Sequence, residues 1–251
     1  MSFANKVVLV TGASSGIGAS TAILFSKEGA NVSMVGRNET KLRNVAEQCA
    51  AVGNKPLVII ADVSNDNDAK RIITETVDTF GKLDILVNNA GLGKPGCIAD
   101  GSIVEAYDVI FKVNVRAVMQ LTSLATPHLI KTKGNVVNIS SAAAMTTPIS
   151  PDSLSYYVSK AALDHFTRGA ALELSSYGVR VNSVNPGPVF TDFLDNAGIN
   201  AKFEELTNRT ALNRVSQPEE IANMIAYLAG DNAVGITGST FVVDNGILLK
   251  K

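Results

Sequence analysis

The stretch Val7-Val8-Leu9-Val10-Thr11-Gly12-Ala13-Ser14-Ser15-Gly16-Ile17-Gly18 decides the fold of this chain. Its four apolar, mostly β-branched residues predict a buried strand, and Ala19 to Lys27 have helical composition, with Gly29 as a stop. A glycine-rich turn between strand and helix lets a phosphate approach backbone N–H groups at the positive end of the helix, and Ser14 and Ser15 add hydroxyl donors. The stretch therefore predicts a strand, a phosphate loop and a helix.

Six more strand-like runs follow, separated by segments long enough for crossover helices. The seven runs are Val7 to Val10, Asn31 to Val35, Leu57 to Ile60, Ile85 to Val87, Asn135 to Ile139, Val179 to Val184 and Phe241 to Val243. Near-continuous apolar runs indicate strands buried on both faces. We therefore expect an α/β fold: one doubly wound, Rossmann-type domain over residues 1–251, with a seven-stranded parallel sheet and helices on both faces. Ligands bind such sheets where strands end.

The end of the second predicted strand indicates which nucleotide binds. The spacing Gly-x3-Gly-x-Gly differs from the generic dinucleotide fingerprint, so a plain tight turn stays open for the loop taken alone. An acidic residue after the second strand would repel a 2′-phosphate, but the chain has Gly36-Arg37-Asn38 there. Arg37 can pair its N–H groups with phosphate oxygens, which favours NADP(H) over NAD(H), although a solvated arginine is the alternative. Asp62-Val63 is placed to meet adenine, and a helix cap would explain Asp62 equally well.

Tyr156 and Lys160 lie four residues apart in a stretch that predicts the first turns of a helix, so they share one face. A phenol has a pKa of about 10, and a nearby ammonium group favours its ionised form, which makes tyrosine usable as an acid/base. Ser140-Ser141 ends the fifth predicted strand, at the rim that carries the phosphate loop. A serine there can hydrogen-bond a substrate carbonyl, whereas a turn or helix cap is the alternative interpretation of Ser141.

Together these motifs resemble the classical short-chain dehydrogenase/reductase family over essentially the whole chain. The resemblance is carried by Thr11-Gly12-x3-Gly16-x-Gly18, Asn88-Asn89-Ala90-Gly91, Asn114, Ser141, Tyr156-x3-Lys160, Asn185-Pro186-Gly187-Pro188-Val189, Gln217 to Ala222, Ile236-Thr237-Gly238 and Val243-Asp244-Asn245-Gly246. It implies an enzyme that moves hydride between a nicotinamide and a carbonyl or alcohol carbon. In this family helices equivalent to Ile103 to Ile130 and Ser155 to Tyr177 commonly pack between subunits, which implies a homotetramer.

The resemblance also implies a role for each matching residue. Tyr156 is the expected proton donor and acceptor, Ser141 orients the substrate oxygen, and Lys160 holds the nicotinamide ribose. Asn114 matches a fourth active-site position, where a helix irregularity lets its backbone anchor a water; the residues alone suggest only a polar position in a long helix. Further cofactor contacts are expected from Asn89, Ala90 and Gly91 and, on the nicotinamide side, from Pro186, Gly187, Val189 and Thr191.

Three departures from the family pattern stand out. Ser141 precedes Tyr156 by fifteen residues where thirteen is common, so the Thr146 to Ser153 loop is longer and could reshape the substrate mouth. The Asn114 motif reads Asn-Val-Arg-Ala instead of Asn-Val-x-Gly, which leaves its helix geometry open. Asp244-Asn245-Gly246 replaces Asp-Gly-Gly, a change we expect to be mild.

The composition excludes several other classes of protein. A formal net charge of −1, from 22 basic and 23 acidic residues, gives no sign of a nucleic-acid partner. Cys49 and Cys97 form no Cys-x-x-Cys motif, and His128 and His165 stand alone in helical contexts, so we expect neither a disulfide framework nor a metal site. No apolar run reaches the roughly 18 residues of a membrane span. We see no signal peptide at the start and expect a cytoplasmic protein.

The segment from Pro186 to Gln217 lacks strand signals and predicts short helices on the ligand rim. We interpret about 188–217 as a substrate lid, with a surface helix pair as the equal alternative. Its apolar residues, Phe190, Phe193, Leu194, Ile199, Phe203 and Leu206, favour a lipophilic ketone or alcohol such as a steroid, isoprenoid or retinoid. A 3-oxoacyl-thioester reductase is the alternative. A non-catalytic nucleotide-binding regulator is less favoured because Ser141, Tyr156 and Lys160 are all present, and epimerase or dehydratase relatives usually carry a larger C-terminal domain.

Overall fold

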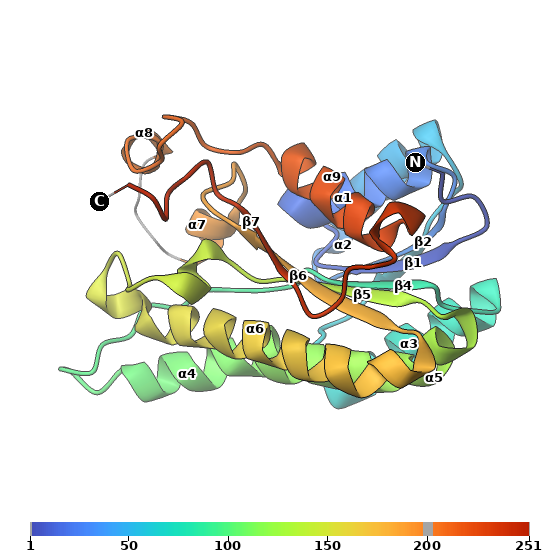
Figure 1. The fold of residues 1–251 in the computed structure, drawn as a ribbon, viewed down its shortest axis with the longest axis horizontal. Coiled ribbons are helices and arrows are strands. Elements are labelled where there is room, and N and C mark those ends of the chain that lie inside the picture. The colour runs from blue at the N-terminus through green and yellow to red at the C-terminus, as the bar shows by residue number, and fades with distance from the viewer. Residues whose placement is uncertain (1, 198–202, 251) are drawn as a thin grey trace.

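The structure is a computed structural model and describes residues 2–197 and 203–250 (Figure 1). In these residues seven strands form one sheet, in the order β3-β2-β1-β4-β5-β6-β7, and every neighbouring pair is parallel. The strands are β1 (Val7–Thr11), β2 (Asn31–Gly36), β3 (Leu57–Ile60), β4 (Ile85–Asn88), β5 (Asn135–Ile139), β6 (Arg180–Pro186) and β7 (Thr240–Val243). The predicted fold class is confirmed.

Strands β3 and β5 have the predicted bounds, and the other five differ from them by one or two residues at one or both ends. The largest difference is in β6, which starts at Arg180 and runs to Pro186 because Asn185 and Pro186 pair with Val242 and Val243 of β7. Sequence periodicity cannot show this extension, since it depends on a partner strand about sixty residues away.

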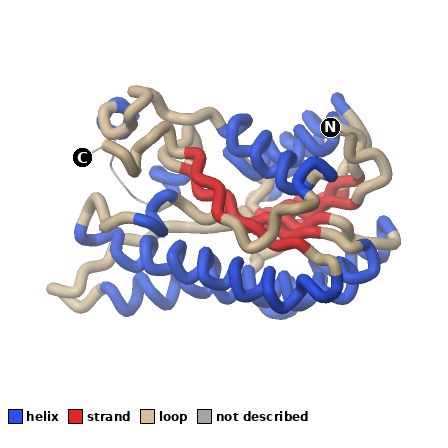
Figure 2. Tube along the Cα trace, viewed as in Figure 1, coloured by secondary structure: helices blue, strands red, loops and turns tan. Residues whose placement is uncertain are grey.

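Helices cover both faces of the sheet, and the strands run between the two helical layers (Figure 2). The main helices are α1 (Gly16–Lys27), α2 (Glu39–Val52), α3 (Asp66–Phe80), α4 (Ile103–Phe111), α5 (Val118–Thr132), α6 (Leu154–Leu174) and α9 (Pro218–Ala229). Helices α1, α2 and α9 lie above the sheet in Figure 1, and α4 and α6 lie below it. Two short helices, α7 (Phe193–Asn196) and α8 (Phe203–Thr207), lie at the left end.

Strand β1 shows why the sheet needs both layers. Val8 and Val10 point into the apolar core under α1, α2 and α9, whereas Val7 and Leu9 point into the core formed with α3, α5 and α6. All four are at most 1% exposed. Since full burial of such a side chain contributes about 1.5–3 kcal/mol, a central strand of this kind is stable only between two helical layers.

The chain from Ile103 to Thr132 is not one regular helix. A π-helical turn, Lys112–Ala117, separates α4 from α5 and places Asn114 inside it. The structure thus has the helix irregularity that the family resemblance implies at Asn114, whereas the interpretation from the residues alone, a polar position in a long helix, is wrong. A π turn bonds each N–H to the fifth carbonyl back, and side-chain periodicity does not report that change.

The carboxyl ends of the strands lie at one rim, on the side of α7 and α8 in Figure 1. The phosphate loop, Ser141 and the segment after β6 all follow strand ends at this rim. In the described part of the chain no helix is both long and apolar enough to cross a membrane.

Candidate active site

The phosphate loop is tied to the end of β4 by side chains of Thr11 and Asn89. The Thr11 hydroxyl accepts hydrogen bonds from the backbone N–H groups of Asn89 and Ala90, both at 3.0 Å. In return, the Asn89 amide donates to the carbonyls of Thr11 and Gly12, at 2.8 and 3.2 Å. These contacts join two predicted cofactor segments into one rigid edge.

The loop leaves room for a pyrophosphate at the start of α1. Gly12 and Gly16 have φ values of +66° and +54°, which L side chains rarely adopt. Ser15 is the N-cap of α1 and its hydroxyl makes no capping hydrogen bond, while the first intrahelical bond runs from the Ala19 N–H to the Ser15 carbonyl. The amides of the first turn therefore precede the helical ladder and can bind an anion, so the loop fits the expected dinucleotide.

The end of β2 carries the predicted 2′-phosphate site. Arg37 is exposed, and nothing within the described ranges pairs with its guanidinium. Asn38 caps α2, because its side chain accepts the Lys41 N–H at 3.0 Å. A Cβ on Gly36 would lie 3.4 Å from the Ser14 Cβ, so the loop and the β2 end are direct neighbours.

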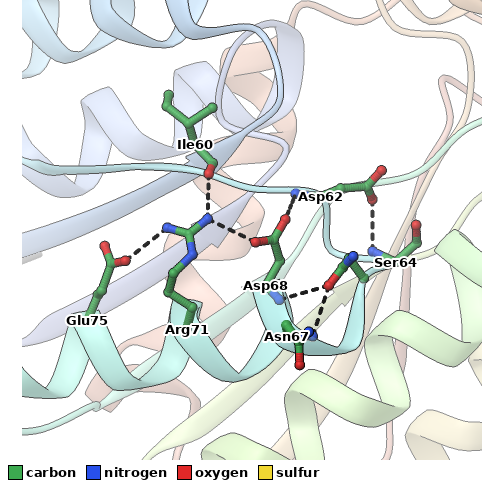
Figure 3. Close-up of polar contacts among 8 residues, drawn as sticks. Ile60, Asp62, Ser64, Asn67, Asp68, Arg71 and Glu75 are labelled. Atoms are coloured by element: carbon green, nitrogen blue, oxygen red, sulfur yellow. Dashed lines mark hydrogen bonds and ion pairs between the residues drawn. The ribbon is translucent and has the colours of Figure 1, made fainter.

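Asp62 lies in a braced turn after β3 (Figure 3). Its N–H donates to the Asp68 carboxylate at 2.8 Å, and its own carboxylate accepts the Ser64 N–H at 2.9 Å. The Arg71 guanidinium donates a hydrogen bond to the Asp68 carboxylate at 3.0 Å and another to the Ile60 carbonyl at 2.6 Å.

The cap of α3 is Asn65, which accepts two backbone N–H groups, so the alternative of Asp62 as helix cap is wrong. One oxygen of Asp62 accepts the Ser64 N–H, and no other contact of that carboxylate is found among the residues described. Val63 is buried beside it. Asp62 therefore remains available to meet adenine.

Ser141, Tyr156 and Lys160 come together at the rim. Tyr156 is hydrogen-bonded to Ser141. The Lys160 ammonium lies 5.7 Å from the centre of the Tyr156 ring and donates to the Ile139 carbonyl at 2.8 Å. Ser141 also caps a short 3-10 helix by accepting the Ala143 N–H at 3.1 Å, so the cap and the site position coexist in one residue.

The pKa values of this pair correct one expectation. Burial raises the pKa of Tyr156 to about 12, and the hydrogen bond with Ser141 opposes that rise only in part. Burial lowers the pKa of Lys160 to about 8, and the Asp164 carboxylate opposes that shift. The expectation that Lys160 lowers the Tyr156 pKa fails in this structure, because the ammonium faces the ring and a carbonyl. Tyr156 is thus neutral, and a proton donor, at neutral pH.

Asn114 is buried and fully bonded by its side chain. Its carbonyl oxygen accepts the Leu92 N–H at 2.9 Å, and its amide donates to the Leu92 carbonyl at 3.0 Å and to the Ser159 hydroxyl at 3.1 Å. A Cβ on Gly91 would lie 3.4 Å from Asn114 and 3.5 Å from the Lys160 Nζ. The π turn therefore brings Asn114 close to Lys160 despite its Asn-Val-Arg-Ala motif.

The predicted nicotinamide side is formed by the segment after β6. The Ser141 hydroxyl donates to the Pro186 carbonyl at 3.5 Å. Gly187 packs against the Asp244 backbone, where a Cβ would come within 2.7 Å. Val189 forms an isolated bridge with Ser216. Thr191 lies over the phosphate loop, because a Cβ on Gly16 would come within 2.7 Å of its methyl group.

The segment predicted as a lid contacts both Tyr156 and helix α2. The Phe193 ring lies 5.3 Å from the Tyr156 ring, and Lys41 of α2 forms an ion pair with Asp192. Phe190 is 39% exposed. Of the other apolar residues predicted for this segment, Ile199 lies outside the described residues.

The two remaining departures have local explanations. In the longer loop, the Ile149 N–H donates to the Tyr157 hydroxyl at 3.2 Å and the Asp152 carbonyl accepts the Gly96 N–H at 2.8 Å, so the loop is folded against the site. Asn245 has a φ of +52°, which Asn tolerates better than most residues, and it bonds Arg214 and Ser216.

Reasoning from the sequence assigned no role to several residues that hold the site. They are Thr11, Leu92, Ser159, Asp164 and, as a positioning side chain, Asn185. Polar residues at buried strand ends, such as Thr11 and Asn185, are a signal that could have found some of them, since buried polar groups need partners.

The fold and this cluster define an oxidoreductase that uses a nicotinamide dinucleotide. A family model described as enoyl-(acyl carrier protein) reductase matches residues 12–248. The chain belongs to the short-chain dehydrogenase/reductase family.

Its curated relatives carry several activities. An uncharacterized oxidoreductase of Thermotoga maritima is 39% identical, with 98% of both chains covered. A 3-oxoacyl-[acyl-carrier-protein] reductase of the same organism is 31% identical, covering 99% of this chain and 100% of that protein. A glucose 1-dehydrogenase of Gluconobacter oxydans is 35% identical, covering 98% of this chain and 93% of that protein.

Solved structures match the fold closely. A Caenorhabditis elegans short-chain dehydrogenase/reductase of unknown function, with cofactor, has a TM-score of 0.93 at 37% identity, covering 99% of this chain and 97% of that one. A Brucella melitensis 3-ketoacyl-(acyl-carrier-protein) reductase complexed with NADH has a TM-score of 0.88 at 32% identity, covering 98% of this chain and 99% of that one. A Burkholderia cenocepacia short-chain dehydrogenase in complex with NADP has a TM-score of 0.90 at 31% identity, covering 99% of this chain and 100% of that one.

Proposed function

We propose that this protein is an NADP(H)-dependent oxidoreductase that interconverts a lipophilic ketone or aldehyde and the corresponding alcohol, with Tyr156 as the acid/base. The observation that carries the proposal is the cluster at the rim, where Ser141 bonds Tyr156 and Lys160 lies under the same ring. The relatives include reductases and dehydrogenases, so the general reaction agrees with the family.

In reduction, the hydroxyls of Ser141 and Tyr156 bind the substrate carbonyl oxygen. A bound reduced nicotinamide supplies the hydride. As negative charge develops on the oxygen, Tyr156 transfers its proton to it, and Ser141 stabilises the same charge. A pKa of about 12 keeps Tyr156 protonated at neutral pH, which suits this direction. In oxidation the proton moves back to Tyr156.

In this proposal Lys160 holds the cofactor, and Lys160 and Asn114 together maintain the route along which the proton reaches Tyr156. Lys160 is 4% exposed, and its ammonium can hold the nicotinamide ribose on the side of Gly91. Asn114 fixes Leu92 and Ser159 close to Lys160, so the π turn would keep a route from Tyr156 through Lys160 in one geometry.

Arg37 supports the preference for NADP(H). Its guanidinium follows neutral Gly36 and has no partner among residues 2–197 and 203–250, so it is free there to bind a 2′-phosphate. Arg37→Ala should weaken NADPH binding about 10- to 100-fold, since a hydrogen bond to a charged group contributes about 1.5–3 kcal/mol, and should leave NADH binding unchanged.

Isothermal titration with NADPH and with NADH measures the affinity of Arg37→Ala for each cofactor. Arg43→Ala is the matched control, because Arg43 is a neighbouring cation paired with Glu39. Retained NADPH preference in Arg37→Ala would contradict the assignment.

The substrate is proposed to be lipophilic because an aromatic ring packs on Tyr156 and the loop before it exposes two apolar side chains. Phe193 packs on the tyrosine ring, and Met145 and Ile149, in the loop between Ser141 and Tyr156, are 47% and 48% exposed. A panel of steroid, isoprenoid and retinoid carbonyls, 3-oxoacyl thioesters and glucose, assayed with NADPH, tests the class. Higher kcat/KM for the thioesters would favour the reductase alternative that several relatives represent.

We also propose a cytoplasmic homotetramer and a lid over about 188–217. Helices α4, α5 and α6 support the assembly because they expose Val104, Met119 and Leu172, which are 63%, 46% and 80% accessible. Light scattering coupled to gel filtration measures the subunit number, and a monomer at micromolar concentration would contradict the assembly.

A further inference from the structure

Asp164 is a buried carboxylate without a role in the proposed reaction. It lies on α6, one turn after Lys160, and is 5% exposed. A carboxylate removed from water needs hydrogen bonds or an opposite charge close by. Its Oδ2 accepts a hydrogen bond from the side-chain amide of Asn185 at 2.8 Å.

Asn185 carries this contact to the catalytic serine. It is fully buried near the end of β6, between β5 and β7. Its Nδ2 donates both to Asp164 and to the backbone carbonyl of Ser141, the latter at 3.0 Å. Because an amide nitrogen has two hydrogens and the amide oxygen would repel a carboxylate, Asp164 fixes which way the Asn185 amide points.

Lys160 provides the charge that balances Asp164. The two residues are one turn apart on α6, and both are at most 5% exposed. Burial lowers the pKa of Lys160, and the Asp164 charge acts in the opposite direction. Asp164 is therefore linked to Lys160 by charge and to Ser141 by the Asn185 hydrogen bonds.

We propose that Asp164 is a positioning residue that, through Asn185, holds the Ser141 backbone so that the Ser141 hydroxyl faces Tyr156 and the substrate oxygen. The inference rests on the proposed function of Ser141 and Tyr156. A purely structural role in the core is the alternative, and it predicts a loss of stability without a specific effect on the reaction.

The first test compares Asp164→Ala with Thr167→Val. Thr167 is the matched control because it lies on the next turn of α6, is fully buried and likewise accepts an Asn amide, that of Asn138 at 2.9 Å. Asp164→Ala should lower kcat about 10- to 100-fold with NADPH affinity unchanged, somewhat less than the loss of an oxyanion donor costs. Asp164→Asn, which keeps an acceptor oxygen, should recover most of kcat. Thr167→Val should lose stability and keep kcat.

Equal losses of kcat in Asp164→Ala and Thr167→Val would overturn the inference, as would a normal kcat in Asp164→Ala. If Asp164→Ala does not fold, Asn185→Ala removes the same link from β6 and should give the same loss of kcat at unchanged NADPH affinity; a normal kcat there would equally overturn it.

The second test does not depend on turnover. With 13C-labelled tyrosine, the Tyr156 ring resonance reports its hydrogen bond with Ser141. Asp164→Ala should shift this resonance in the same direction as Ser141→Ala, whereas Thr167→Val should not. If the wild type reduces no carbonyl, the proposed function fails; if the resonance is unchanged in Asp164→Ala, the positioning role fails.

Discussion

Replacing Gly18 with alanine tests how closely the phosphate loop is packed. The φ of Gly18 is not positive, so a methyl group there is excluded by contacts and not by backbone conformation. Its Cβ would lie 2.2 Å from the Gly12 oxygen and 2.5 Å from the Asn89 Nδ2. Carbon and oxygen atoms normally stay at least about 3.3 Å apart, so the Gly12 carbonyl must move by about 1 Å.

The expected cost follows from these contacts. Overpacking costs about 1–3 kcal/mol, and breaking the Asn89 to Gly12 hydrogen bond costs about 1 kcal/mol. The higher helix propensity of alanine offsets about 1 kcal/mol. Gly18→Ala should therefore lower the free energy of unfolding by about 1–3 kcal/mol and weaken NADPH binding, because Gly18 lies against Gly12 in the proposed anion site.

Urea unfolding and fluorescence titration with NADPH measure both effects. Gly169→Ala on α6 is the control: apart from its own helix backbone, no atom of the described residues lies within 4 Å of its Cβ position, so stability should rise by about 0.5–1 kcal/mol. A Gly18→Ala protein with wild-type stability and NADPH affinity would refute the packing argument.

Two further predictions concern the catalytic pair and the lid. The Lys160 pKa of about 8 lies below its ordinary 10.5, so between these values the folded chain binds fewer protons than the unfolded chain and rising pH favours folding. From pH 8 to 10 the stability of the wild type should rise relative to Lys160→Met by about 2 kcal/mol in urea unfolding, and parallel curves would contradict the buried ammonium. Phe193→Ala should open the space above Tyr156 and raise kcat/KM for bulky ketones about tenfold over small ones, and an unchanged ratio in a steady-state assay would exclude Phe193 as a limit on substrate size.

Much of the fold follows from local patterns. The seven strands were predictable because a strand buried on both faces has a near-continuous apolar run, as in Val7–Thr11 and Asn135–Ile139. The rim positions of the phosphate loop, Ser141 and the segment from Pro186 were predictable for the same reason, since each lies at the end of a strand. What the sequence could not show depends on partners distant in the chain.

The site illustrates this limit. The pKa of Tyr156 depends on burial, to which distant parts of the chain such as Phe193 contribute, so a Tyr-x3-Lys pattern gives the wrong direction. The Asn114 turn depends on i to i+5 bonding, which leaves no periodic trace. Asp164 looks like an ordinary helix residue until Asn185, 21 positions later, is placed against it.

The most direct measurement of the central claim is the rate of NADPH-dependent ketone reduction by Tyr156→Phe, with NADPH affinity determined on the same samples. Phenylalanine keeps the ring against Phe193 and Lys160 but removes the proton donor. We expect kcat to fall about 10²- to 10⁴-fold while NADPH still binds. A variant that binds NADPH and reduces the same ketone at a near-wild-type rate would contradict the assignment of Tyr156 as the acid/base.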